Sequence, residues 1–155
     1  MSLTIDDKTA YRVSKGRKED IPFAYDLIDE FCKESLEEYG ITLNRELVTS
    51  VVDRFTDYFY VLHVQGKLVG LIAGFIGENF INGTKYFHEQ VWYVSKEYRR
   101  YGIKLLKIVE QRCLSEGIKS FVLIHMGNLR PEKMRGLYEH LGYKFLEAHY
   151  VKNIE

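Results

Sequence analysis

The sequence is poor in the residues that build covalent or metal-stabilised frameworks. Only two of its 155 residues are cysteines, Cys32 and Cys113. They lie far apart and form no Cys-x-x-Cys pair, so we expect reduced, buried thiols in a cytoplasmic protein. The five histidines show no ligand spacing among themselves or with the cysteines. The sequence therefore predicts neither a disulfide framework nor a metal site.

An excess of charge and a long apolar run are also missing. The 22 Lys and Arg residues balance the 22 Asp and Glu residues, which gives no reason to expect nucleic-acid or membrane binding. The most apolar run, residues 68–77, is too short to span a bilayer, and the polar N-terminus does not resemble a signal peptide. No Ser-His-Asp or Cys-His set stands out, which favours chemistry without a covalent enzyme intermediate. The length suits one domain, residues 1–155.

Apolar periodicity divides the chain into helices and strands. A first helix is expected to begin after Asp20, its candidate N-cap, and to stop at Gly40. Three further helices are expected over residues 44–56, 101–116 and 131–141. Strands are expected over residues 10–14, 58–64, 68–76, 85–94, 118–126 and 143–151. The run 118–126 is mostly apolar, so we expect it to be buried on both faces. The resulting order is β-α-α-β-β-β-α-β-α-β.

Residues 91–109 combine an apolar strand, a short basic loop with one glycine, and an amphipathic helix that follows without a spacer. Backbone N–H groups at a helix N-terminus, with the helix dipole, attract an anion such as phosphate. Arg99, Arg100 and Lys104 add positive charge, and Gly102 stands where the backbone must approach a bulky group. The paired glycines of a Rossmann loop and the Gly-Lys-Ser/Thr of a Walker loop are absent. Three consecutive antiparallel strands also argue against an unrelated α/β nucleotide-binding protein.

The segment Arg99-Arg100-Tyr101-Gly102-Ile103-Lys104 resembles the Gln/Arg-x-x-Gly-x-Gly/Ala loop of the GNAT (Gcn5-related N-acetyltransferase) family. A second segment, Leu137-Tyr138-Glu139-His140-Leu141-Gly142-Tyr143, is similar to that family's Leu-Tyr-Glu-Lys-Leu-Gly-Phe. The resemblance implies an α+β, three-layer fold, with a mixed, mostly antiparallel central sheet and helices on both faces. It also implies acetyl-CoA (coenzyme A) as co-substrate. The expected contacts are Trp92, Tyr93, Val94, Arg99, Arg100, Tyr101, Gly102, Ile103, Lys104 and Leu105.

Lys104 departs from the family pattern, which has glycine or alanine at that position. A lysine there must point away from the phosphates or reach for one itself. Among the strand residues, Val94 is the expected partner of the pantetheine arm, because in this family the arm pairs with the strand edge like an added strand.

The resemblance makes Tyr138 the candidate general acid. A phenol stays protonated at neutral pH and can protonate the thiolate that leaves when an amine attacks a thioester. A base is expected on the strand before the phosphate loop, and both Glu89 and His88 qualify. Strict alternation puts His88 with Trp92 and Val94, and Glu89 with Tyr93, but a bulge could exchange the faces. The choice between them stays open at this stage.

The expected reaction is direct transfer of acetyl to a primary amine, carried by a small molecule or a peptide. The acidic residues of the first helix could line a site for a cationic amine, although a solvated helix face explains them as well. Tyr39, Tyr58 and Phe80 are further pocket candidates, and Asn128 is a candidate for a polar role before the last helix. The alternative, favoured by Lys104, is a non-catalytic GNAT-fold binding or sensor module. The terminal strand could pair across a homodimer.

Overall fold

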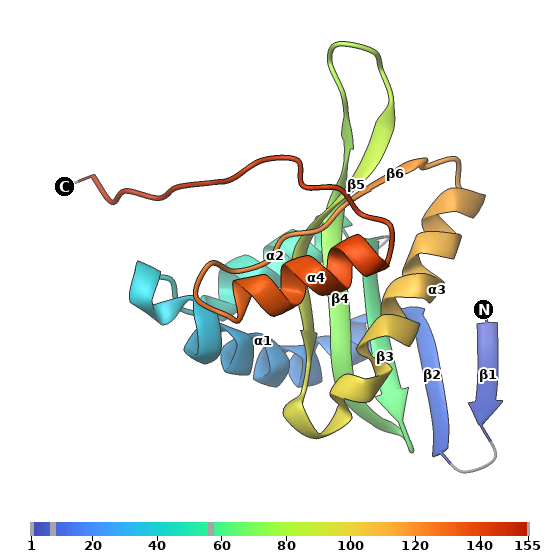
Figure 1. Ribbon diagram of the computed structural model, residues 1–155. Helices are drawn as coiled ribbons and strands as arrows, with labels where there is room; N and C mark the ends of the chain where they lie inside the picture. Colours follow the sequence, from blue (N-terminus) through green and yellow to red (C-terminus); the bar gives the residue numbers. More distant parts are fainter. Residues whose placement is uncertain (1, 7–8, 56–57, 155) are drawn as a thin grey trace.

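The computed structural model describes residues 2–6, 9–55 and 58–154 and contains one six-stranded sheet with helices on both faces (Figure 1). Its elements are β1 (Ser2–Asp6), β2 (Thr9–Lys15), α1 (Ile21–Ser35), α2 (Arg45–Phe55), β3 (Phe59–Val64), β4 (Lys67–Glu78), β5 (Lys85–Val94), α3 (Gly102–Ser115), β6 (Ser120–Val122) and α4 (Pro131–His140). The strands lie in the order β1-β2-β3-β4-β5-β6. All neighbours are antiparallel except β5 and β6, which are parallel. The predicted mixed, mostly antiparallel sheet is therefore confirmed.

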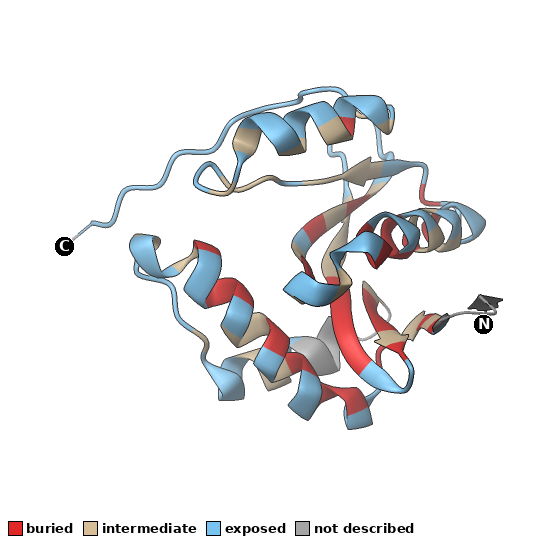
Figure 2. Ribbon diagram, turned by 60° about the horizontal axis from the view of Figure 1, so that its bottom comes forward, coloured by how far each residue is buried: buried red, intermediate tan, exposed pale blue. Residues whose placement is uncertain are grey.

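Two apolar clusters hold the layers together. On one face Leu105, Leu106 and Val109 of α3 pack on the sheet and are wholly buried. On the other face the contacts come from Leu27 and Phe31 of α1. The central strands β3 and β4 lie between these clusters, and Figure 2 shows burial concentrated there and on the inward sides of α1 and α3. The α1–α2 layer and the α3–α4 layer thus lie on opposite faces of the sheet (Figure 1).

The ends of the first helix differ in detail from the prediction. Asp20 is the N-cap residue of α1, but its side chain makes no cap hydrogen bond. A 3-10 turn, Lys18–Asp20, precedes the helix, and the Asp20 carboxylate accepts from the N–H of Arg17 instead. Gly40 does end the segment, in the left-handed conformation with φ 74°, after a second 3-10 turn.

The strands near the C-terminus are shorter than predicted. Of the run 118–126, only Ser120–Val122 is a strand, and its exposed to half-buried residues are not buried on both faces. The predicted strand 143–151 is wrong, because residues 143–154 form no strand and those from 144 onward are exposed. β6 is therefore an edge strand, which explains its exposure. The additional strand β1 was not predicted.

A β-bulge interrupts the pairing of β4 with β5. Ala73 pairs with Val91, but the next residue, Gly74, pairs with Glu89, so Gln90 is the extra residue. A bulge reverses which face the following side chains point to. Phe87 before the bulge and Val94 after it accordingly belong to the same α3-side cluster.

Gly74 is the residue that makes this bulge possible. A Cβ atom built on it would lie 2.2 Å from the carbonyl oxygen of His88. We expect Gly74→Ala to lower the free energy of unfolding by about 2 kcal/mol, because backbone must move to relieve the overlap. Urea unfolding measures this, with Gly127→Ala as the control, since a Cβ there meets nothing within 4 Å. Equal stability of the two variants would contradict the prediction.

Candidate active site

The site lies where β5 and β6 separate. The two strands pair only between Tyr86–His88 and Ser120–Val122. β5 continues to Val94 with β4 on its other side. In the part of the chain that the structure describes, no strand pairs with the opposite edge of β5 beyond His88. This edge of β5 beyond His88 therefore has no neighbouring strand in the described residues.

Glu89 is buried at the point of separation, with 4% of its surface exposed. Its Oε2 accepts a hydrogen bond of 2.9 Å from the N–H of Ile124, in the segment after β6. Burial raises the pKa of the Glu89 carboxyl to about 7, although this hydrogen bond opposes the shift. Glu89 is therefore a carboxyl group that changes its charge near neutral pH, as a general base at this pH requires.

Tyr138 of α4 also hydrogen-bonds to the backbone of Ile124. Its hydroxyl donates to the carbonyl of Ile124 at 2.9 Å, and its ring stacks on Trp92 with centroids 6.2 Å apart. Burial raises the pKa of the Tyr138 phenol well above its ordinary range, and the charge of Glu89 adds to the shift. Glu89 and Tyr138 thus hold the N–H and the C=O of one residue, and the structure brings these two predicted residues together.

His88 lies elsewhere. It stacks on Phe75 of β4, with ring centroids 5.1 Å apart, and its Nδ1 lies 3.0 Å from the carbonyl oxygen of Glu89. The prediction from strict alternation, which grouped His88 with Trp92 and Val94, is wrong because the bulge at Gln90 reverses the faces. Glu89 is the residue that shares the Tyr138 side with Trp92.

The basic loop forms a 3-10 turn, Lys96–Tyr101, and α3 begins at the next residue, Gly102, so the helix follows the loop without a spacer as predicted. The N–H of Gly102 donates to the carbonyl of Arg99 within this turn. Arg100 donates to the carbonyl of Glu97 at 3.1 Å and lies over the Tyr101 ring. The arginine side chains therefore help to shape the loop that precedes α3.

Packing does not require a glycine at position 102. Its φ is −58°, an ordinary helical value, and a Cβ there would lie 3.7 Å from Trp92 and 3.8 Å from Val94. These are normal contacts, so an alanine would fit at this first residue of α3. Neither the backbone conformation nor the packing at position 102 therefore requires a glycine.

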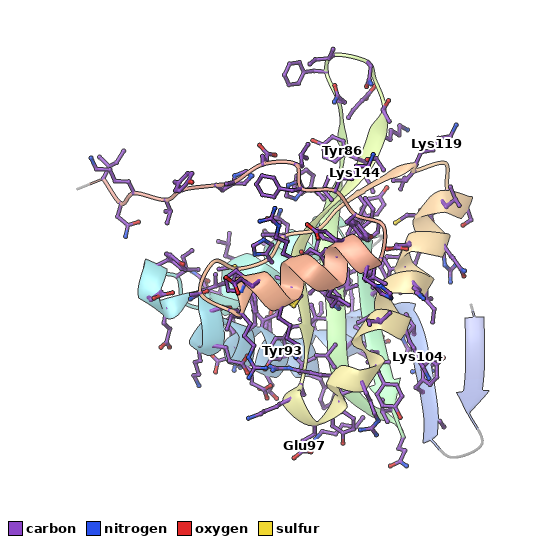
Figure 3. The ribbon with its side chains drawn as sticks, viewed as in Figure 1. Tyr86, Tyr93, Glu97, Lys104, Lys119 and Lys144 are labelled. Carbon is purple, nitrogen blue, oxygen red and sulfur yellow. The ribbon has the colours of Figure 1, made fainter. Side chains whose placement is uncertain are left out.

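The Lys104 side chain extends from α3 toward β2. Its Nζ lies 4.9 Å from the centre of the Tyr11 ring on β2 and 5.7 Å from that of Tyr101. In Figure 3 it lies on the side of α3 that faces β2. The lysine therefore packs against aromatic rings, as expected for the first of the two predicted orientations.

The other residues predicted to contact the co-substrate differ in burial and in their partners. The Tyr93 side chain, labelled in Figure 3, belongs to the α1-side cluster. Its hydroxyl donates to Glu34 at 2.9 Å and to Glu30 at 3.1 Å. Leu105 is wholly buried, so only its backbone could touch a ligand, while Ile103 is 37% exposed. Arg99 donates to Glu34 at 2.9 Å.

The roles of Ile124 and Glu34 in the site could not be predicted from the sequence. Ile124 contributes only backbone groups, which leave no signal in the sequence. Glu34 is one of the acidic residues of the first helix. Its hydrogen-bond partners, Tyr93 and Arg99, lie 59 and 65 residues further along the chain. No periodicity relates such positions.

An acidic pocket of about 260 Å³ lies beside this network, between α1 and the segment before α4. It is lined by Lys33, Glu34, Ser35, Glu37, Glu38 and Asn128. Asn128 donates to the carbonyl of Ser35 at 3.1 Å and to Glu38, so it fastens the two segments together. The three aromatic candidates do not form a common wall. Tyr58 packs on the α3 side, Tyr39 follows α1, and Phe80 is 97% exposed at the β4–β5 turn.

Within residues 2–6, 9–55 and 58–154, no group of three His, Cys, Asp or Glu side chains is placed to hold a metal ion. Over the same ranges, no helix has the length and apolar character needed to cross a bilayer.

Residues 23–143 match the model of the acetyltransferase (GNAT) family. A search of curated protein sequences found no relative of the chain. Among solved structures, a possible acetyltransferase from Clostridium difficile 630 is 21% identical with a TM-score of 0.69, covering 94% of this chain and 98% of that one. Glucosamine-6-phosphate N-acetyltransferase from Arabidopsis thaliana is 16% identical with a TM-score of 0.70, covering 94% and 99%.

A third solved structure is an aminoglycoside N-acetyltransferase in complex with CoA. It is 10% identical with a TM-score of 0.70, and the match covers 94% of this chain and 95% of that one. These identities show a shared fold, whereas the family match spans most of the sequence. The chain therefore belongs to the GNAT family of acetyltransferases.

Proposed function

We propose that residues 1–155 form a single acyltransferase domain that moves an acetyl group from acetyl-CoA to a primary amine by direct attack. One observation carries the proposal. A buried carboxyl of near-neutral pKa and a buried phenol converge on Ile124, beside the open edge of β5. This is the pairing of a proton acceptor and a proton donor that aminolysis of a thioester needs.

Acetyl-CoA supplies an acetyl group on a thioester whose sulfur leaves as a thiol. The new C–N bond forms as the C–S bond breaks. The acceptor binds as an ammonium, loses one proton to solvent and attacks as the neutral amine. Glu89, in its carboxylate form, then takes the second proton from that nitrogen, directly or through water. Tyr138 donates its hydroxyl proton to the departing sulfur, and exchange with solvent then restores both side chains. Neither step needs a covalent bond to the protein.

The residues expected to bind the co-substrate are the open edge of β5 from Trp92 to Val94 and the loop from Arg99 to Leu105. Gly102 supports this role because its missing side chain has no packing reason. The competing interpretation, a non-catalytic binding module, depended on Lys104 closing the loop. The position of Lys104 over the Tyr11 ring supports the catalytic interpretation over that alternative.

The acceptor proposed here is a positively charged amine on a small molecule or peptide. The acidic pocket shares Glu34 with the network at the end of β5, so a cation bound there would lie near the strand that holds the thioester. We expect the domain to act without nucleic acid or membrane, in the cytoplasm. Pairing across a homodimer is left out of the proposal, because residues 143–154 do not form the terminal strand on which that prediction rested.

Titration with acetyl-CoA by calorimetry tests the proposal. We expect binding in the micromolar range, retained by desulfo-CoA and absent for ATP at the same concentration. Absence of binding at millimolar acetyl-CoA would overturn the proposed function and favour the binding module.

Gly102→Ala sharpens the same experiment. We expect acetyl-CoA affinity to fall about tenfold or more, because the new methyl group fills the space kept for the pyrophosphate. Folding should not suffer, since the methyl makes only normal contacts and alanine favours a helix. Unchanged affinity in a variant of full thermal stability would remove Gly102 from the cofactor site.

A further inference from the structure

The side chain of Arg99 closes over the end of β5. Its Nη2 donates to both carboxylate oxygens of Glu34, at 2.9 and 3.2 Å, and its Nε donates to the carbonyl of Val94 at 3.3 Å. We call this arrangement the Arg99 clasp: Arg99, the Glu34 carboxylate and the Val94 carbonyl. It joins α1 to the loop before α3 across the last residue of β5.

The Val94 carbonyl points to the open edge of the strand. The N–H of the next residue, Ser95, donates to the carbonyl of Val69 on β4 at 2.8 Å. Successive residues in an antiparallel strand direct their backbone groups to opposite edges. The carbonyl of Val94 therefore faces away from β4, toward the side where β6 has separated. The clasp thus covers a backbone acceptor that an added ligand strand would use.

We propose that Glu34 holds Arg99 in a position that competes with cofactor binding, so that acetyl-CoA gains Arg99 and the Val94 carbonyl only when the clasp opens. This inference rests on the proposed function. A pyrophosphate carries more negative charge than one carboxylate and accepts bidentate hydrogen bonds from a guanidinium. It can therefore displace Glu34 from Arg99.

Separating Arg99 from Glu34 should cost little free energy. The Arg99 and Glu34 side chains are 50% and 38% exposed, and ion pairs this exposed are weak. Tyr93 also donates to Glu34, so the carboxylate keeps a partner after Arg99 leaves. Removing the Glu34 charge should consequently tighten CoA binding by about two- to fivefold.

Calorimetric titration of CoA into wild type and Glu34→Gln tests the inference. We expect a dissociation constant two to five times lower for the variant, and a difference that shrinks as salt is added. Asp26→Asn is the matched control, because Asp26 is an exposed acid on the same helix and loses the same charge. Structural damage does not tighten binding, so a gain in affinity identifies the release of Arg99.

A double-mutant cycle with Arg99→Gln isolates the pair. In the Arg99→Gln background, Glu34→Gln should leave CoA affinity unchanged. Three outcomes would overturn the clasp while leaving the proposed function intact: equal or weaker CoA binding by Glu34→Gln, an equal gain in Asp26→Asn, or a gain that persists without Arg99. Failure of wild type and variant alike to bind CoA would overturn both.

Discussion

Replacing Tyr138 with phenylalanine is expected to lower kcat for acetyl transfer by about a hundredfold or more, which is the usual contribution of a positioned general acid. The phenol lies buried beside the open edge of β5, donates to Ile124 and stacks on Trp92. Phenylalanine keeps the ring and its stacking but removes the proton. The loss should therefore fall on kcat, with the dissociation constant for acetyl-CoA little changed.

The direction of the pKa shift supports this expectation. Burial raises the pKa of Tyr138, so the phenol carries its proton throughout the range in which the enzyme would be assayed. A thiolate formed in the same buried surroundings is also made more basic, because low polarity disfavours any anion. Proton transfer from phenol to thiolate thus stays feasible although the phenol is a weaker acid than in water.

Tyr143→Phe is the matched control. Tyr143 is a neighbouring tyrosine whose ring centroid lies 6.0 Å from that of Tyr138, and its hydroxyl donates to Glu110 rather than to Ile124. Both variants lose one partly buried hydrogen bond, worth about 1 kcal/mol of stability. Only Tyr138→Phe should lose activity in steady-state kinetics. Full kcat in Tyr138→Phe would exclude the acid role, and equal losses would indicate a packing effect.

The order of elements could be predicted because the local signals agree with the tertiary structure. β5 has the bounds predicted for it, since period-2 alternation follows a strong Asn82-Gly83 turn. The strand predicted over residues 118–126 is shorter in the structure because of its tertiary pairing. Its apolar composition is that of a buried strand, but only Ser120–Val122 finds a partner before the chain leaves β5. The composition of a segment shows how apolar it is, but it does not show how many of its residues will pair with a neighbouring strand.

The candidate site could be predicted where its residues form local sequence patterns, but not where they depend on tertiary contacts. The glycine loop and the Tyr138 segment are local patterns, and both lie beside the open edge of β5. The bulge at Gln90, which turns Glu89 to the Tyr138 side, depends on Gly74 in another strand. The anchoring of Glu89 and Tyr138 uses the backbone of Ile124, which any residue other than proline would supply. These contacts are made by the fold and could not be predicted from the motif.

Glu89→Gln is the second substitution with a large expected effect. An amide cannot take a proton from the attacking amine, so we expect kcat/KM to fall by about a hundredfold. In the wild type, activity should rise with pH through about 7 and then level off, because burial raises the Glu89 pKa to about 7 and only the carboxylate is a base. His88→Gln separates the two candidates: a retained rise through pH 7 supports Glu89, and its loss would transfer the role to His88.

The Glu89 carboxyl should also make the free energy of unfolding depend on pH. Activity is expected to rise with pH, whereas the stability contributed by this group should fall. Its pKa is raised on folding from 4.5 to about 7, so between these values the unfolded chain has lost a proton that the folded protein keeps. Stability from this group therefore falls as pH rises, by about 3 kcal/mol in total once pH exceeds both values. Glutamine keeps an oxygen acceptor for Ile124 but has no such titration.

The difference in unfolding free energy between Glu89→Gln and wild type isolates this effect, because the other titrating groups, including His63 with its lowered pKa, are common to both proteins. Urea unfolding at pH 5 and at pH 8 measures it. We expect the variant to gain stability relative to wild type as pH rises, while its activity is lost at both values. A difference independent of pH would mean that the buried carboxyl is already ionised at pH 5. Glu89 would then be a fixed anion that orients Ile124, and the base would have to be another group.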